Sequence, residues 1–327
     1  CSEATSVVTV TAPTIEAVAD ILTPSINGLA GGDTTLSLIS GDKLNNAQAV
    51  IGTGAGQVSI SGVTVPTGFS INADGTVKVP ANTKAGDYNI VYRICEITNT
   101  SNCSEATSVV TVTAPAIDAF AETTASINGN TGGTTASLTA NDTLDGKPFV
   151  VGSNPGEVTI SIVGTLPTGL TLNANGTITV APNTPKGNYN VEYRICDNNN
   201  SGNCDTVISV VPVTAGDLVA NPDTVASVTG SNTPQTLGVN VLDNDTKNGV
   251  KLNPADVILT ESTPDPKGYL VLNPDGTVTL GANAPAGDYE LTYTICEKLN
   301  TDNCKSNTVT LMVTLPVIDA VLDPIAS

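Results

Sequence analysis

The chain has 327 residues, enough for two or three domains, with a net charge of −19 at pH 7 and no histidine. So acidic a chain is a poor partner for nucleic acid or an anionic membrane, and the lack of histidine excludes Ser-His-Asp and Cys-His catalysis. Scattered Asp and Glu residues suggest no acid–base pair, so we expect a non-enzyme. The apolar residues are mainly Val, Ile, Leu and Ala among many Thr, Asn and Gly, which favours β structure with turns. No apolar run is long enough to span a bilayer.

The chain begins with a copy of its own middle, because residues 1–13 are identical to residues 103–115. We interpret residues 1–13 as the last strand of a truncated preceding repeat. The alternative is that Cys1 is the lipidated residue of a lipoprotein. The identity with an interior segment argues against that alternative.

The rest of the chain repeats with a period of about one hundred residues. Residues 92–95 (YRIC) recur as residues 193–196 (YRIC) and 293–296 (YTIC). This period is the length of one domain. The chain is therefore predicted to be a segment of a longer protein built from tandem domains. The predicted repeats are 14–114, 115–215 and 216–315, and 316–327 is the predicted start of a truncated following repeat.

Within the first repeat the apolar runs are short and show no helical period. Residues 34–40 (TTLSLIS) and 56–63 (GQVSISGV) are predicted strands. Asp74-Gly75 predicts the turn of a hairpin, since glycine tolerates a positive φ. Two long strands follow and are expected to complete a sheet edge. About seven strands in a hundred residues indicate an immunoglobulin-like β-sandwich, so the fold class is all-β with three tandem sandwiches.

Six cysteines form three C-x7-C pairs between predicted strands. The intervening residues are polar turn formers, so a hairpin would place each pair opposite each other on its outer face. A zinc site is the alternative, but this spacing without histidine is a poor zinc pattern. Disulfides would indicate an oxidising, extracytoplasmic setting. The predicted disulfides are Cys95–Cys103, Cys196–Cys204 and Cys296–Cys304, and Cys1 is predicted to be unpaired.

A tyrosine follows Gly-x at the start of each penultimate strand, at Tyr88, Tyr189 and Tyr289. A tyrosine at this place can form a tyrosine corner, with its hydroxyl bonded to backbone. A plain core tyrosine is the alternative.

One stretch of the second repeat resembles the pattern of bacterial Ig-like and cadherin-like repeats. It spans residues 166–196 and reads LPTGLTLNANGTITVAPNTPKGNYNVEYRIC. The whole unit also resembles the tandem repeats of the SprB-type gliding-motility adhesins of Flavobacterium-like Bacteroidota. This resemblance implies an outer-membrane-associated, cell-surface filament exported by type IX secretion. Its implied partners are neighbouring repeats, the gliding machinery, and a surface or polysaccharide bound through other parts of the protein.

No cofactor is expected to be required, but calcium is considered because it stiffens the junctions of cadherins. Residues 140–146 and 241–249 resemble bacterial cadherin-like loops, with Asp142, Asp145, Asp243 and Asp245 as candidate ligands. The full cadherin ligand set is missing, so solvated turns are the alternative.

Bacteroidota attach O-glycans at Asp-Ser/Thr followed by a small or aliphatic residue. Such short patterns also arise by chance in a Thr-rich chain. The candidate sites are Thr34, Thr143, Thr206 and Thr224.

Together these features predict a structural stalk segment of a giant adhesin that serves surface adhesion and gliding. The alternatives are a static adhesin, a glycan- or protein-binding Ig-like module, and the spacer array of a secreted enzyme. Few aromatic residues are available as sugar platforms, which argues against glycan binding.

Overall fold

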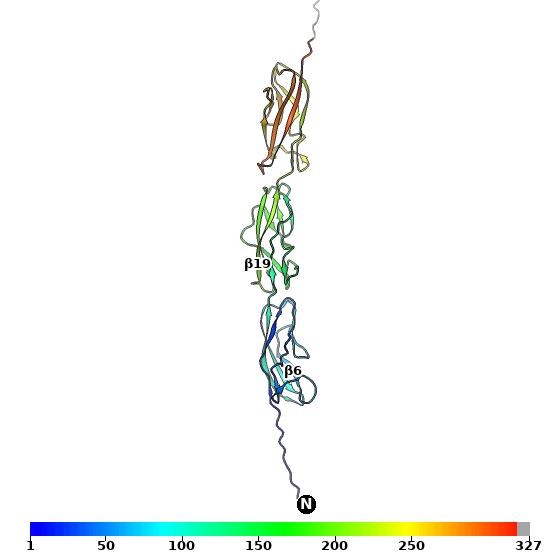
Figure 1. Cartoon of the computed structure of the whole chain (residues 1–327), viewed down its shortest axis with the longest axis vertical. Coiled ribbons are helices and arrows are strands. Elements are labelled where there is room, and N and C mark those ends of the chain that lie inside the picture. The colour runs from blue at the N-terminus through cyan, green and yellow to red at the C-terminus, as the bar shows by residue number, and fades with distance from the viewer. Residues whose placement is uncertain (319–327) are drawn as a thin grey trace, which may run out of the picture.

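The chain folds into three β-sandwich units arranged end to end, and the N-terminal residues lead away from the first unit (Figure 1). The computed structural model describes residues 1–318, so most of the predicted partial repeat at 316–327 lies outside the described residues. Within that range the chain has a single 3-10 helix, and it has no helix that is long and apolar enough to cross a membrane. The prediction of an all-β fold with tandem sandwiches is confirmed.

The first unit, hereafter the first repeat, contains a four-stranded sheet with strand order β2-β10-β9-β6. β2 runs parallel to β10, and the other neighbours are antiparallel. The sheets β3-β8-β7 and β1-β4-β5 supply the other layer. The strands are β1 (Ile15–Glu16), β2 (Ile21–Asn27), β3 (Gly32–Asp33), β4 (Lys43–Leu44), β5 (Ala47–Gln48), β6 (Val58–Thr64), β7 (Ser70–Ile71), β8 (Val77–Val79), β9 (Gly86–Glu96) and β10 (Asn99–Thr113).

The second repeat has the same plan, with the sheets β12-β19-β18-β15, β13-β17-β16 and β11-β14. Only three residues separate β10 from its first strand. Its strands are β11 (Ile117–Asp118), β12 (Ile127–Asn128), β13 (Gly133–Ser137), β14 (Thr143–Leu144), β15 (Val158–Ile162), β16 (Leu170–Leu172), β17 (Thr177–Val180), β18 (Gly187–Asp197) and β19 (Cys204–Thr214).

The third repeat has the sheets β21-β29-β28-β25, β22-β27-β26 and β20-β23-β24. Its elements are β20 (Leu218–Val219), β21 (Asp223–Thr229), β22 (Gln235–Asn240), β23 (Thr246–Lys247), β24 (Val250–Lys251), η1 (Pro254–Asp256), β25 (Val257–Thr263), β26 (Leu270–Leu272), β27 (Thr277–Leu280), β28 (Gly287–Glu297) and β29 (Cys304–Thr314).

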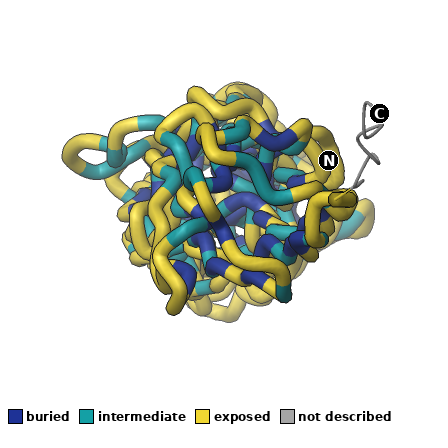
Figure 2. The backbone as a smooth tube through the Cα atoms, turned by 90° about the horizontal axis from the view of Figure 1, so that it is seen from above, coloured by how far each residue is buried: buried dark blue, intermediate teal, exposed yellow. Residues whose placement is uncertain are grey.

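Each repeat has its own hydrophobic core between its layers. In the first repeat, Ile90, Tyr92 and Ile94 on β9 are fully buried, and Val110 and Val112 on β10 join them. This alternation is the one predicted for a strand with a single buried face. The view along the long axis shows buried positions in the middle of the cross-section and exposed ones around it (Figure 2).

Two predictions about the first repeat are wrong. The two long strands β9 and β10 do not complete a sheet edge, because β2 and β6 flank them. Residues 34–40 are not a strand, since the backbone closes a turn there, with the Ser40 N–H bonded to the Ser37 carbonyl. Ser and Thr side chains favour such turns by bonding to nearby backbone.

Residues 1–13 form no strand in this structure, although their sequence is that of β10 and its continuation. Val8 is 82 % exposed, whereas its counterpart Val110 is fully buried. A strand needs a neighbour for its backbone hydrogen bonds, and β10 has β2 and β9 on its two sides. The same sequence is thus paired with neighbouring strands in one copy and has no strand partner in the other.

Candidate functional site

The loops closed by the cysteine pairs stand at the end of each repeat that faces the preceding one. The structure contains the three predicted disulfides, Cys95–Cys103, Cys196–Cys204 and Cys296–Cys304. In each pair the two cysteines are directly opposite in the strand register, with Cα atoms 4.1 Å apart. Cys1 is exposed and unpaired.

Replacing a cysteine pair by serine, for example Cys196→Ser with Cys204→Ser, should lower the free energy of unfolding of that repeat by about 2–3 kcal/mol. The loss arises because the open loop gains conformational freedom in the unfolded chain. Urea unfolding would measure it, with Cys1→Ser as the matched control that should leave stability unchanged. Equal stability of the double variant and the control would contradict this prediction.

The sequence predicts only turn formers in these loops, but the loops also share a motif that joins the repeats. Each loop has the form acid-x-x-Asn-x-x-Asn, beginning at Glu96, Asp197 and Glu297. The last asparagine holds the linker before its repeat. The side-chain amides of Asn102, Asn203 and Asn303 donate to the carbonyls of Pro13, Pro115 and Gly216.

The middle asparagine of the motif reaches the preceding repeat. Asn200 accepts a hydrogen bond of 2.8 Å from the Ala85 backbone N–H, and Asn300 accepts one of 2.7 Å from the Lys186 backbone N–H. The acid of the same loop orients each asparagine, because the side-chain amides of Asn200 and Asn300 donate to Asp197 and Glu297. These acids and asparagines are buried, so their hydrogen bonds fix the position of the loop.

A second hydrogen bond joins the two repeats at each junction. Asn27 donates to Asp145 over 2.9 Å, and Asn128 donates to Asn248 over 2.8 Å. Asp145 and Asn248 occupy corresponding turns and both have positive φ. Each junction is therefore held by two hydrogen bonds from equivalent positions.

Further contacts are particular to one junction. Leu29 of the first repeat packs against the core of the second. At the next junction Asn130 donates to Glu297, and Lys186 forms an ion pair with Asp302 at 2.7 Å. A three-residue linker with these contacts leaves little freedom for one repeat to swing against the next.

The three tyrosines at the start of the penultimate strands have the hydrogen bond of a tyrosine corner. Their hydroxyls donate to the backbone carbonyl four residues upstream over 2.6–2.8 Å. The acceptors for Tyr88, Tyr189 and Tyr289 are Lys84, Pro185 and Pro285.

The candidate calcium ligands do not converge. Asp142 and Asp245 are buried, and each accepts hydrogen bonds from a backbone N–H and from the hydroxyl of the second tyrosine of β18 or β28. Asp145 accepts the junction hydrogen bond, and exposed Asp243 pairs with Lys251 at 2.9 Å. Among residues 1–318, no three acidic, histidine or cysteine residues group as metal ligands.

Instead, each repeat holds a pair of neighbouring carboxyl groups at one edge of its four-stranded sheet. The pairs are Asp20 with Asp42, Glu122 with Asp142, and Asp223 with Asp245. Burial, helped by repulsion from Asp142, raises the pKa of Glu122 to about 7. Burial and repulsion from Asp245 raise the pKa of Asp223 to about 6. Within the described residues, one oxygen each of Asp20, Asp42, Glu122 and Asp223 is buried without a hydrogen-bond partner.

The glycosylation candidates differ in accessibility. Thr34 is only 3 % exposed, and its hydroxyl donates to the Leu36 carbonyl and accepts from the Val77 N–H. That oxygen is inaccessible in the folded repeat, so Thr34 is the least accessible of the four candidates. Thr143 is half-buried, and Thr206 and Thr224 are exposed.

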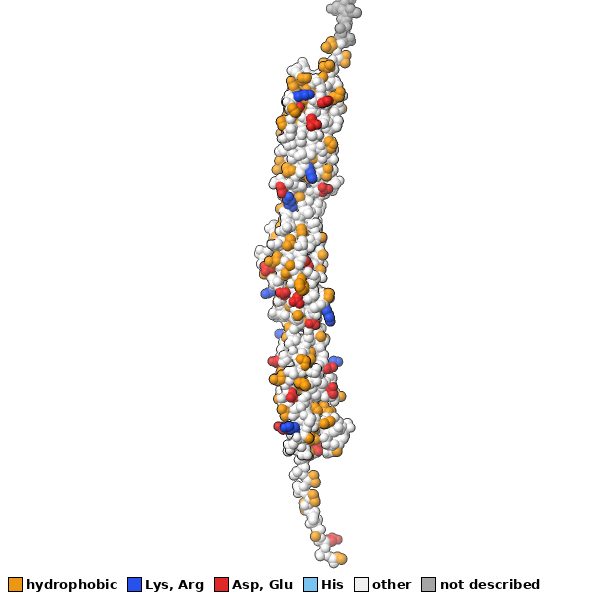
Figure 3. Space-filling view, in the orientation of Figure 1, with side chains coloured by type: hydrophobic (Ala, Val, Ile, Leu, Met, Phe, Trp, Pro, Cys, Tyr) orange, Lys and Arg blue, Asp and Glu red, His pale blue; other side chains and the backbone are white. Residues whose placement is uncertain are grey.

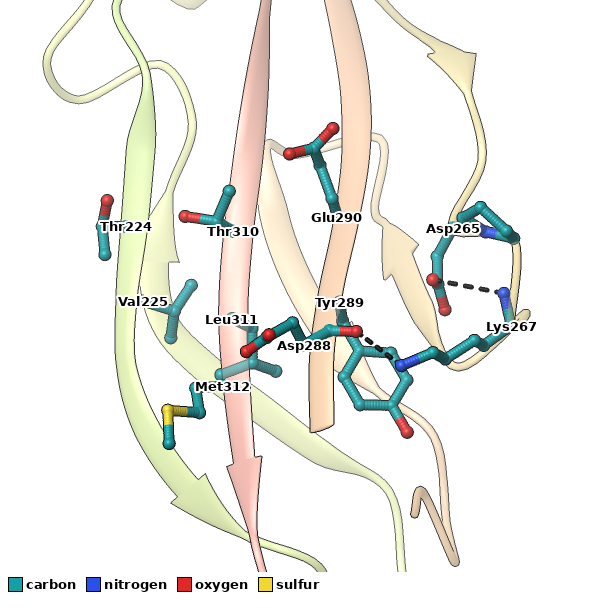
Figure 4. A pocket seen from close by; sticks show the side chains of 11 residues that line it. Thr224, Val225, Asp265, Lys267, Asp288, Tyr289, Glu290, Thr310, Leu311 and Met312 are labelled. Carbon is teal, nitrogen blue, oxygen red and sulfur yellow. Dashed lines mark hydrogen bonds between the residues drawn. The ribbon is translucent and has the colours of Figure 1, made fainter. Parts of the chain in front are cut away.

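A surface pocket of about 460 Å³ lies on the third repeat between strands β21, β29 and β28 and the loop at 265–267 (Figure 4). Met312 and Val225 lie on one side of Asp288, and Tyr289 and Lys267 lie on the other. Lys267 donates to the Asp288 backbone carbonyl over 2.6 Å, and its amine lies 4.4 Å from the centre of the Tyr289 ring.

No family model matches the sequence, and no curated protein matches it. Among solved structures, mouse cadherin-23 EC22-24 is 14% identical over 93% of this chain and 99% of its own, with a TM-score of 0.33. Drosophila OTK extracellular domains 3-5 are 12% identical over 94% and 98%, with a TM-score of 0.27. An endo-fucoidan hydrolase of glycoside hydrolase family 107 is 15% identical over 94% and 45%, with a TM-score of 0.25. Scores this low say nothing about function, and the fold class rests on the sheets described above.

Proposed function

We propose that this chain is a structural stalk segment of an extracellular, cell-surface adhesin that serves adhesion and gliding motility. The observation that supports it is the pair of junctions, where equivalent asparagines lock each repeat to the next. A rod built from such joints can hold a distant adhesive part away from a cell and transmit a pulling force. This mechanical role requires no catalytic site.

The surface of the rod fits the proposal. The face seen in Figure 3 carries acidic side chains scattered along all three repeats, without a single dense patch. With a net charge of −19 the segment should stay soluble and repel its copies. The disulfides fit an extracytoplasmic location.

Loosening the junctions should make the rod bend. Asn200→Ala with Asn300→Ala removes the acceptors for the Ala85 and Lys186 N–H groups, each hydrogen bond contributing about 1 kcal/mol. Small-angle X-ray scattering should then show a shorter maximum dimension and a broader distance distribution than for the unchanged chain. Asn190→Ala, on an exposed strand position, is the control that should leave the scattering unchanged. Identical scattering of all three proteins would contradict junction locking.

The cellular role is tested by labelling living cells of the bacterium that produces the protein with an antibody against this segment. Signal that travels along the cell body supports a motor-driven adhesin. Fixed surface signal would leave a static adhesin, and the absence of surface signal would overturn the proposal in favour of a secreted spacer.

A further inference from the structure

The third repeat differs from the other two in the loop beside the pocket. Val65 and Leu166 pack against the cores of the first and second repeats, but Asp265 stands in the same place before the loop proline. Asp265 is buried and accepts hydrogen bonds from the backbone N–H groups of Tyr269 and Leu270. In the third repeat this loop is therefore held by hydrogen bonds to Asp265, whereas in the other repeats an apolar side chain at the same position packs against the core.

The sheet beneath the pocket differs as well. In the first repeat Asp87 accepts a 2.7 Å hydrogen bond from Thr111, the residue opposite it on the neighbouring strand. In the third repeat the corresponding pair is Asp288 and Met312, and a thioether cannot donate. The carboxylate of Asp288 is thereby left free, and Met312, 54 % exposed, adds an apolar surface beside it.

A second carboxylate follows on the same face of the same strand. Glu290 stands where the first and second repeats have Asn89 and Asn190. Within residues 1–318 neither Asp288 nor Glu290 forms an ion pair. Their Cα atoms are two residues apart on an extended strand, about 7 Å.

We propose that this pocket binds an extended peptide of a partner protein that presents an arginine beside an apolar side chain. The guanidinium would bridge Asp288 and Glu290, and the apolar parts would cover Met312, the exposed cross-strand partner of Asp288. Arginine suits this place because its planar group pairs with carboxylates and is weakly hydrated, while its stem packs on apolar surface. The pocket offers no open aromatic platform to a sugar, because Lys267 covers the Tyr289 ring. This site is independent of the stalk function.

The chain contains one methionine, so selective ¹³C-methyl labelling places a single NMR reporter in the pocket at Met312. The probes are the peptide Ac-Leu-Arg-Val-NH₂ and its neutral isostere with citrulline in place of arginine. We expect the arginine peptide to shift the Met312 methyl signal saturably, with at least tenfold tighter binding than the citrulline peptide. Half-molar sodium chloride should remove most of that difference, because the carboxylates are exposed.

Asp288→Asn with Glu290→Gln should remove the tenfold preference while leaving the fold intact, since both side chains are exposed. Asp87→Asn, the counterpart change in the first repeat, should leave the preference unchanged. A methyl signal that does not move, equal binding of the two peptides, or a preference that survives in the double variant would each overturn the proposal.

Discussion

The protein should become less stable as the pH rises from about 5 to 8, with the midpoint of thermal unfolding falling across that range. The cause is the three buried carboxyl pairs, and Glu122 shows the sign. Its pKa is about 7 in the folded protein against 4.5 as the ordinary value. The folded state therefore binds the proton more tightly, and stability is fully present below pH 4.5 and is lost as the pH rises through 7. For this half-buried group the loss is on the order of 2–3 kcal/mol.

The groups around Glu122 explain why its pKa is raised. Asp142 lies beside it, Asp205 adds negative charge to Asp142, and Tyr193 donates its hydroxyl to Asp142. No cationic side chain offsets these charges among the described contacts of the pair. Ionising both carboxyls would place two like charges in a region largely screened from water.

The measurement is thermal unfolding at pH 5, 6.5 and 8 for the unchanged chain and for Glu122→Gln. The variant should lose the contribution of Glu122 to the pH dependence, whereas Glu192→Gln, an exposed carboxylate of the same repeat, should keep it. Stability that rises with pH would contradict this prediction. So would a large fall of the unfolding midpoint on adding chelator at pH 7.5, since the carboxyls would then hold a cation in place of a proton.

The local features of the fold follow from sequence because they depend on neighbouring residues. The hairpin predicted at Asp74-Gly75 forms between β7 and β8, and Gly75 has a φ of 81°. The pairing of Cys95 with Cys103 follows from their positions on two strands joined by a polar loop. In each case a few residues of backbone geometry decide the outcome.

The order of strands in the sheet and the junction contacts could not be obtained in this way. Whether β2 lies beside β10 depends on how distant segments pack, which the alternation of apolar residues does not specify. Asn200 and Ala85 are 115 residues apart and belong to different repeats. The acid-x-x-Asn-x-x-Asn motif was visible in three loops, and it was the repeated signal that could have revealed these residues.

Gly129→Ala should destabilise the second repeat by about 3 kcal/mol or more, a severe loss for a change of one methyl group. A Cβ atom at Gly129 would lie 2.1 Å from the Thr184 carbonyl oxygen and 2.8 Å from a Val213 methyl. The backbone cannot easily yield, since the Gly129 N–H bonds to the Thr214 carbonyl and the Thr184 N–H bonds to the Gly129 carbonyl. The tight approach therefore admits only glycine.

The repeats supply graded controls for this prediction. In the first repeat, the Cβ atom of Gly28→Ala would lie at the same 2.1 Å from the Thr83 carbonyl oxygen, so this change should destabilise its repeat equally. In the third repeat, the Cβ atom of Gly230→Ala would lie 3.0 Å from the Ala284 carbonyl oxygen, so the loss of stability should be smaller. The Cβ atom of Gly238→Ala would have no atom within 4 Å. Urea unfolding should show Gly129→Ala and Gly28→Ala as the least stable variants, Gly230→Ala as intermediate and Gly238→Ala as the most stable. Equal stability of Gly129→Ala and Gly238→Ala would contradict the argument. Because Asn128 and Asn130 flank Gly129 and both donate to the third repeat, the harmful change should also loosen that junction.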